Sequence, residues 1–396
     1  MLSSYRRVLS VPGTLAFSAT GFVARLPISM VGLGIVLMIS GQLGSYTLAG
    51  TVAAAYVMAN ALFAILHGRL LDRLGQSRVL PTTQVLVALS MVLLVWAVQD
   101  DWPVWSLHLF AATTGASLPQ VGSAVRARWA HALSEPRQVQ TAYALEAVVD
   151  EAVFLVGPVL ATLLATTWHP SAGLVAAGLF GVTGTLYLST QRRTEPPRYP
   201  RRHRATHGHR RMPWRMVLPM VALCLALGVI FGAVEVTTVA FAEERGAKAW
   251  AGVVLGIWAL GSLVAGVVTG AVHWRRSADA RMRLGMTAMA VAMLPLLLVD
   301  TMVGLASLLL LGGLAISPTL IATMSLANEV LPRARLTEGM ALLHTGMAAG
   351  VAPGAAISGL LIDQGGATAA FVVPVVAGAV GVVAGLLTPR PATVTP

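Results

Sequence analysis

The stretch QRRTEPPRYPRRHRATHGHRRMPWR, residues 191–215, is rich in arginine and proline and nearly free of apolar residues until its end. Such a segment stays in water, because a charged side chain at the centre of a bilayer costs about 3 kcal/mol or more. The whole chain, in contrast, has 396 residues of which 56% are apolar and only 11% are charged. The stretch therefore divides a polytopic membrane protein into two parts.

Working outward from this linker, we find six apolar runs before it and six after it. Each is near the ~20 residues that a helix needs to cross a ~30 Å hydrocarbon layer. We predict an all-α polytopic membrane protein with twelve transmembrane helices in two pseudo-symmetric six-helix bundles, residues 1–190 and 215–396, joined by a basic linker, 191–214. The turn between the ninth and tenth runs is short, so these two can also be divided differently. The predicted spans are 15–39, 46–66, 79–98, 105–125, 141–165, 171–190, 215–241, 250–272, 283–300, 302–327, 337–361 and 368–388.

The distribution of basic residues predicts the orientation in the membrane. If the N-terminus is cytoplasmic, all of the 27 lysines and arginines except Arg25, Arg245 and Lys248 fall in cytoplasmic segments. This bias, together with anionic lipid, accounts for the net charge of +11, so we expect no nucleic-acid partner. The first apolar run is too long for a signal peptide and carries Arg25 in its middle, so we expect it to remain as the first helix.

Residues that would carry enzyme chemistry are few. Cys224 is the only cysteine, which excludes an intramolecular disulfide, and we interpret it as a small buried residue. His203, His207 and His209 lie together in the linker, but no acidic ligand stands beside them. There is no phosphate-binding glycine loop with a lysine, which argues against an ATP-driven pump. We predict no metal, no cofactor and no enzymatic activity.

The two halves share a pattern that suggests an internal repeat. PRQVQT, residues 136–141, enters the fifth span, and PRARLT, residues 332–337, enters the eleventh. Each of these spans then contains a glycine beside a proline: Gly157 with Pro158, and Pro353 with Gly354. Proline removes a backbone hydrogen bond, so these pairs are predicted helix kinks.

The loop after the second span carries a recognisable motif, HGRLLDRLGQSR, residues 67–78. It resembles the loop signature of the major facilitator superfamily, G-x-L-x-D-R-x-G followed by two basic residues. Gln76 and Ser77 stand where the family has a base. The matching residues are Gly68, Leu70, Asp72, Arg73 and Gly75, with Arg78 as a trailing base.

With its twelve spans and central linker, the chain resembles bacterial exporters of this superfamily over essentially its whole length. The resemblance implies a bacterial cytoplasmic membrane protein with both termini in the cytoplasm. It also implies that Asp72 is a conformational latch against the start of the eleventh helix, where helix-terminal amides favour a carboxylate. The alternative is that the loop is only a soluble turn.

Three carboxylates lie within the fifth span, in ALEAVVDEAVFLVGPVL, residues 144–160. Glu146 and Asp150 are four apart on one helix face, and Glu151 is rotated by about 100° from Asp150. Arg25 lies at a similar depth in the first span, about 15 Å from the cytoplasmic end. The resemblance places these two helices side by side, so our leading assignment is a pair of Arg25 with Asp150 or Glu151.

One base cannot neutralise three acids, so at least one acid is expected to gain and lose a proton near neutral pH. This would couple transport to protons. The alternative is a static brace of Arg25 with one acid, with Glu146 facing cytoplasmic water.

Other intramembrane polar residues are weaker candidates. Glu235 in the seventh span could contact a cationic substrate or serve as a second proton site, or it could be an interfacial acid hydrated from outside. His344 could titrate near pH 7, or it could be a hydrogen-bonded packing residue. The family lines its path with helices one, four, seven and ten, which suggests a cavity set of Pro119, Gln120, Arg126, Trp258 and Pro318 with His344, and with Asn60 and Gln84 as further polar groups.

We therefore predict a monomeric secondary transporter whose partners are a small-molecule substrate, protons and membrane lipid. Sugar carriers usually present many polar side chains, whereas this chain has only two asparagines, Asn60 and Asn328. Proton-coupled efflux of a small hydrophobic or amphipathic compound is favoured. Of the helix-five antiporter signature of the family, only Gly157 and Pro158 are present. The alternatives are proton-coupled uptake of a metabolite and a non-transporting receptor or scaffold.

Overall fold

The computed structural model describes the backbone of residues 2–197, 212–271, 274, 276–332 and 335–390. This part of the chain is almost entirely helical and contains no strand. It forms two compact units, one of residues 1–44 and 55–204 and the other of residues 45–54 and 205–396. The division at 204 falls outside the described residues, so the predicted domain limits at 190 and 215 stay a prediction.

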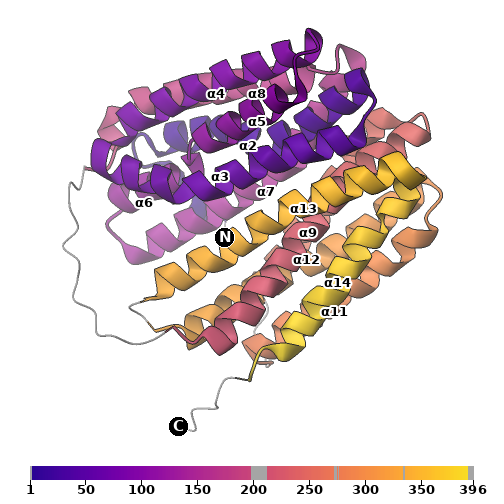
Figure 1. The fold of residues 1–396 in the computed structure, drawn as a ribbon. Coiled ribbons are helices and arrows are strands. Elements are labelled where there is room, and N and C mark those ends of the chain that lie inside the picture. The colour runs from indigo at the N-terminus through magenta and orange to yellow at the C-terminus, as the bar shows by residue number, and fades with distance from the viewer. Residues whose placement is uncertain (1, 198–211, 272–273, 275, 333–334, 391–396) are drawn as a thin grey trace. The chain divides into compact units, whose positions relative to one another are not determined.

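In the first half of the sequence the helices are α1 (Leu2–Leu9), α2 (Thr14–Leu43), α3 (Tyr46–Leu74), α4 (Gln76–Gln99), α5 (Val104–Ser117), α6 (Val121–Ala132), α7 (Pro136–Thr167), α8 (Ala172–Thr190) and a 3-10 turn η1 (Arg192–Thr194). The second half contains α9 (Trp214–Glu244), η2 (Lys248–Trp250), α10 (Ala251–Ala271), α11 (Ala278–Met293), η3 (Leu294–Leu298), α12 (Met302–Val330), α13 (Leu336–Ala370) and α14 (Val372–Leu387). Figure 1 shows these elements coloured from indigo to yellow along the chain.

The predicted all-α polytopic fold with twelve spans is confirmed, with one difference in the fourth span. Ten helices of the described chain are long and apolar enough to cross a membrane, and α14 is a shorter apolar helix. The remaining predicted span, 105–125, is wrong as a single helix, because it divides into α5 and α6. Pro119 lies in the break, where it lacks an amide donor and disfavours a helical conformation at Leu118.

The same pairs of helices pack together in both units. In the first unit α2 packs against α7 and α8, and α4 packs against α5 and α8. In the second unit α9 packs against α13 and α14, and α11 packs against α12 and α14. Each pair occupies the corresponding place in the order of spans, so the two six-helix arrangements follow one packing plan.

The predicted kinks coincide with close helix packing. Helices α7 and α13 continue through Pro158 and Pro353. A side chain added at Gly157 would collide with Ser29 on α2, and one added at Gly354 would collide with the backbone of Val229 on α9. The glycines therefore allow close helix contact. The kinks themselves stay a prediction, since the non-helical residue inside α13 is Gly366.

The single cysteine follows the prediction made for it. Cys224 lies in α9 with no exposed surface and is surrounded by the apolar core of the second unit. Leu223 and Leu227 beside it on the same helix are equally buried. Cys224 therefore behaves as a small apolar packing residue.

Candidate functional site

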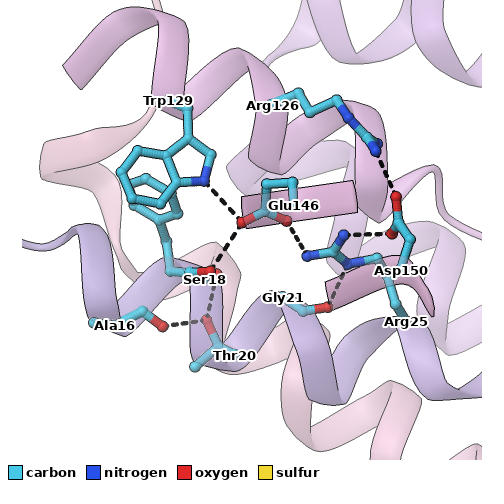
Figure 2. Close-up of polar contacts among 10 residues, drawn as sticks. Ala16, Ser18, Thr20, Gly21, Arg25, Arg126, Trp129, Glu146 and Asp150 are labelled. Atoms are coloured by element: carbon cyan, nitrogen blue, oxygen red, sulfur yellow. Dashed lines mark hydrogen bonds and ion pairs between the residues drawn. The ribbon is translucent and has the colours of Figure 1, made fainter. Parts of the chain in front are cut away.

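A charged cluster lies inside the first unit, centred on Arg25 of α2. The Arg25 side chain is 5% exposed although its helix spans the membrane. Its Nε donates to the backbone oxygen of Gly21 at 2.9 Å, one turn earlier on the same helix. Its two terminal nitrogens pair separately with Glu146 and with Asp150 of α7, the latter at 2.6 Å (Figure 2). One guanidinium thus ties α2 to α7 at two successive turns.

Glu146 is the buried member of the cluster and has no exposed surface. One carboxylate oxygen accepts from Ser18 Oγ at 2.8 Å and from Trp129 Nε1 at 2.8 Å, and the other receives Arg25. Trp129 is fully buried and packs edge-on against Phe17, with 4.7 Å between the ring centroids. Glu146 is thus held by donors from α2 and α6, which offset the cost of burying a carboxyl group.

Asp150 is the accessible member of the cluster. Its side chain is 33% exposed and lies between two arginines, pairing with Arg25 through one oxygen and with Arg126 of α6 through the other (Figure 2). Arg126 is itself 38% exposed. The cluster contains two arginines and two carboxylates, so its charges balance only while Asp150 is ionised.

The sequence identified most of this cluster but not its charge balance. Arg25 meets Asp150, as the equal depth of the two residues predicts. The expectation of one base facing three acids is wrong, because Arg126, a predicted cavity residue, supplies a second base. Glu146 does not face water. Glu151 is partly buried and has no ion pair among the described residues.

Two residues of the site were missed, Ser18 and Trp129. Trp129 lies three positions after Arg126 on α6, so one face of this short helix presents both side chains to α7. The i, i+3 spacing of Arg126 and Trp129 is the feature of the sequence that could have identified Trp129. A single fourth span that ends at residue 125 excludes both residues from the helix, so this spacing has no meaning there.

The other candidates from the sequence lie apart from the cluster. Gln120 Nε2 donates to Asn60 Oδ1 at 3.3 Å, and Pro119 is buried beside it. Trp258 is 7% exposed and packs against Phe231 with ring centroids 5.2 Å apart. Its assignment to a cavity stays a prediction. Pro318 lies inside α12, Gln84 is buried, and Glu235 of α9 is partly buried with no ion pair in the described chain.

A cavity of about 470 Å³ opens in the second unit, between α12 and α13. Of the residues proposed from sequence for a cavity, His344 is the one that contributes to its wall. The rest of the wall is Leu320, Ile321, Met324, Ser325, Asn328 and Met347.

The contacts of the signature loop, residues 67–78, give a structural reason for the departures from the family pattern at Gln76 and Ser77. Gly75 precedes α4 with φ +89° and ψ 154°, a conformation open essentially to glycine alone. Gln76, which replaces a base, is buried: its amide donates to Ala124 O at 3.0 Å and accepts from Arg128 Nε at 2.7 Å. A basic side chain at this position would face the guanidinium of Arg128.

Ser77, the second departure, also has a local partner. Its backbone nitrogen and hydroxyl both donate to one carboxylate oxygen of Glu195, at 3.0 and 3.2 Å. Glu195 follows η1, so the first turn of α4 is attached to the beginning of the linker. Leu70 packs against the core of the first unit, whereas Gly68 has open space around it and Arg73 and Arg78 are exposed. The side chain of Asp72 lies outside the described part, so the latch stays a prediction.

A family model and several solved structures are similar to this chain, and all of them are of transporters. The family model described as Major Facilitator Superfamily matches residues 17–312 and 282–396. No curated protein matches the sequence. Among solved structures, the nucleoside transporter NupG is similar with a TM-score of 0.75 and 13% identity, over 94% of this chain and 98% of that chain.

Two further solved structures agree with this fold. A peptide transporter POT in complex with sulfate is similar with a TM-score of 0.75 and 14% identity, over 97% of each chain. A bacterial homologue of the iron transporter ferroportin, in an inward-facing state, is similar with a TM-score of 0.69 and 16% identity, over 95% of this chain and 99% of that chain. At these identities the likeness shows the fold alone.

Proposed function

Because this chain belongs to the Major Facilitator Superfamily, we propose that it is a proton-coupled secondary transporter that exports a small hydrophobic or amphipathic compound. It is a multi-pass membrane protein of a transporter family and not an enzyme. The proposal extends this to a bacterial cytoplasmic membrane, a monomer with both termini inside, and cargo exchanged for protons.

The position of Asp150 between two arginines carries the proposal of proton coupling. A proton on Asp150 removes the charge that Arg25 and Arg126 share, leaving the cluster with a net positive charge. Glu146 is enclosed by three donors, whereas Asp150 is one-third exposed, so Asp150 is the member that a proton can reach. A proton gradient can bias a transport cycle if protonation favours one conformation over another.

The direction of transport is supported by the chemistry of the chain rather than by the cluster. The cavity in the second unit has a mainly apolar wall, and asparagine is scarce in the sequence. Such surfaces suit compounds that partition into membranes, and the driving force that we propose for moving these compounds outward is the proton gradient. Uptake of a polar metabolite would call for more hydrogen-bonding groups.

The test is accumulation of a panel of dyes and antibiotics in an efflux-deficient bacterium that expresses the wild type, Asp150→Asn or Glu151→Gln at matched levels. Glu151→Gln is the control, because it removes a neighbouring carboxylate that has no described ion pair. We expect the wild type and Glu151→Gln to lower accumulation until a protonophore is added, and Asp150→Asn to leave accumulation unchanged. Higher accumulation than in empty cells would show uptake. Protonophore-sensitive export by Asp150→Asn would contradict the role of Asp150.

A further inference from the structure

The cavity between α12 and α13 has a wall of distinctive composition. Of the wall residues that the structure describes, four are apolar and three are polar, and none of these seven carries a carboxylate. It is an open hollow of about 470 Å³ rather than an enclosed chamber. Two of the apolar residues, Met324 and Met347, are flexible and polarisable thioethers, which adapt to ligands of different shape.

Helical spacing makes the wall continuous on each side. Leu320, Met324 and Asn328 are four apart on α12 and therefore share one face. His344 and Met347 are three apart on α13 and share another. Both sides are held by membrane helices, so the site is positioned by the packing of the second unit rather than by a loop.

Two of the three polar groups are available to a ligand. Ser325 Oγ already donates to Ile321 O at 2.7 Å, within its own helix. Asn328 and His344 are exposed, and neither has a hydrogen-bond partner among the side chains and backbone groups that the structure describes. His344 lies two residues into the candidate membrane span Leu342–Ala370. There a polar side chain is better matched by water or a ligand than by lipid.

Resting on the proposed transport function, we propose that this cavity binds the transported compound, and that it takes an uncharged or anionic molecule with an aromatic or otherwise polarisable body. The body lies against Met324 and Met347, and one polar group bonds to His344 and Asn328. Among the described residues of this wall, a cation finds no carboxylate to pair with. The site thus selects by charge as well as by shape.

The test uses three compounds with one ring system: 2-naphthol, 2-naphthoate and 2-naphthyltrimethylammonium. Binding to purified protein in nanodiscs is measured by equilibrium dialysis without a proton gradient, with empty nanodiscs as the blank. We expect the neutral and anionic compounds to bind and the cation to bind at least about tenfold more weakly. Equal or tighter binding of the cation, or no binding of any of the three, overturns the proposal.

Variants then locate the site. His344→Ala and Asn328→Ala should each weaken binding by about threefold to tenfold, the effect of losing one hydrogen bond. Ser307→Ala is the matched control and should bind normally, because Ser307 lies on α12 outside the wall and its hydroxyl donates to Val303 O within the helix. If all three variants bind alike, the compounds bind elsewhere and the proposal fails. Circular dichroism confirms folding of each variant.

The proposed proton-coupled export and the proposed ligand site in the cavity can be refuted independently of each other. Asp150→Asn should keep charge-selective binding while losing export, because it changes the first unit only. Binding with the expected selectivity but without protonophore-sensitive export by the wild type would refute the proposed function and leave the cavity standing. Export that favours cations, unaffected by His344→Ala, would refute the cavity and leave proton coupling standing.

Discussion

Glu146 and Asp150 show how one helical turn separates two roles for the same chemical group. Both carboxylates face Arg25, but one is enclosed by Ser18 and Trp129 and the other is partly open. Enclosure makes Glu146 part of the packing between α2, α6 and α7. Partial exposure makes Asp150 the residue to which we assign the proposed proton exchange.

Replacing Glu146 should therefore damage stability rather than coupling. Glu146→Gln leaves the buried Arg25 with one carboxylate instead of two, and breaking a buried pair costs about 3 kcal/mol. We expect a lower thermal unfolding temperature in detergent for Glu146→Gln, and little change for Glu151→Gln as the control. An unfolding temperature equal to that of the wild type would indicate that Glu146 is already neutral, and the proton site would have to be reassigned.

At this scale the sequence predicted the pair but not its surroundings. Arg25 and Asp150 could be matched because depth along a helix is set by a fixed rise per residue. Arg126 could not be placed, because its direction depends on how α6 leaves the break at Pro119. That direction is a property of tertiary packing, which no local pattern records.

At the scale of elements, the two glycines of the signature loop have different causes. Gly75 has a positive φ at the start of α4, whereas Gly68 lies within α3 with open space where a Cβ would be. The sequence motif alone does not distinguish Gly68 from Gly75. The backbone shows that only Gly75 is required by conformation.

This difference predicts opposite effects for one substitution. Gly75→Ala should destabilise the protein by about 1 to 3 kcal/mol, the cost of forcing a side chain into this conformation. Gly68→Ala should be neutral or stabilise by up to about 1 kcal/mol, because alanine favours a helix. Thermal unfolding of the two variants measures both. Equal destabilisation would show that Gly68 also has a structural constraint that the open space conceals.

Across the whole molecule, the features that the sequence predicts well are those governed by the membrane. Span length and apolar content fix the number of spans, and the order of spans is repeated in the packing of each unit. What it predicts poorly is irregular backbone, such as the break between α5 and α6. The cavity wall was predicted only at His344, because its methionines look like ordinary core residues in a sequence.

The burial of Cys224 has a practical consequence for following this protein in a living cell. A thiol with no exposed surface should not react with a maleimide, so the unmodified chain gives a silent background for cysteine labelling. In intact cells, an impermeant maleimide should then label Ala249→Cys, on the predicted outer side, and should label Arg193→Cys only after permeabilisation. The reverse pattern would invert the predicted orientation. Every later probe of motion can be introduced without first removing a native thiol.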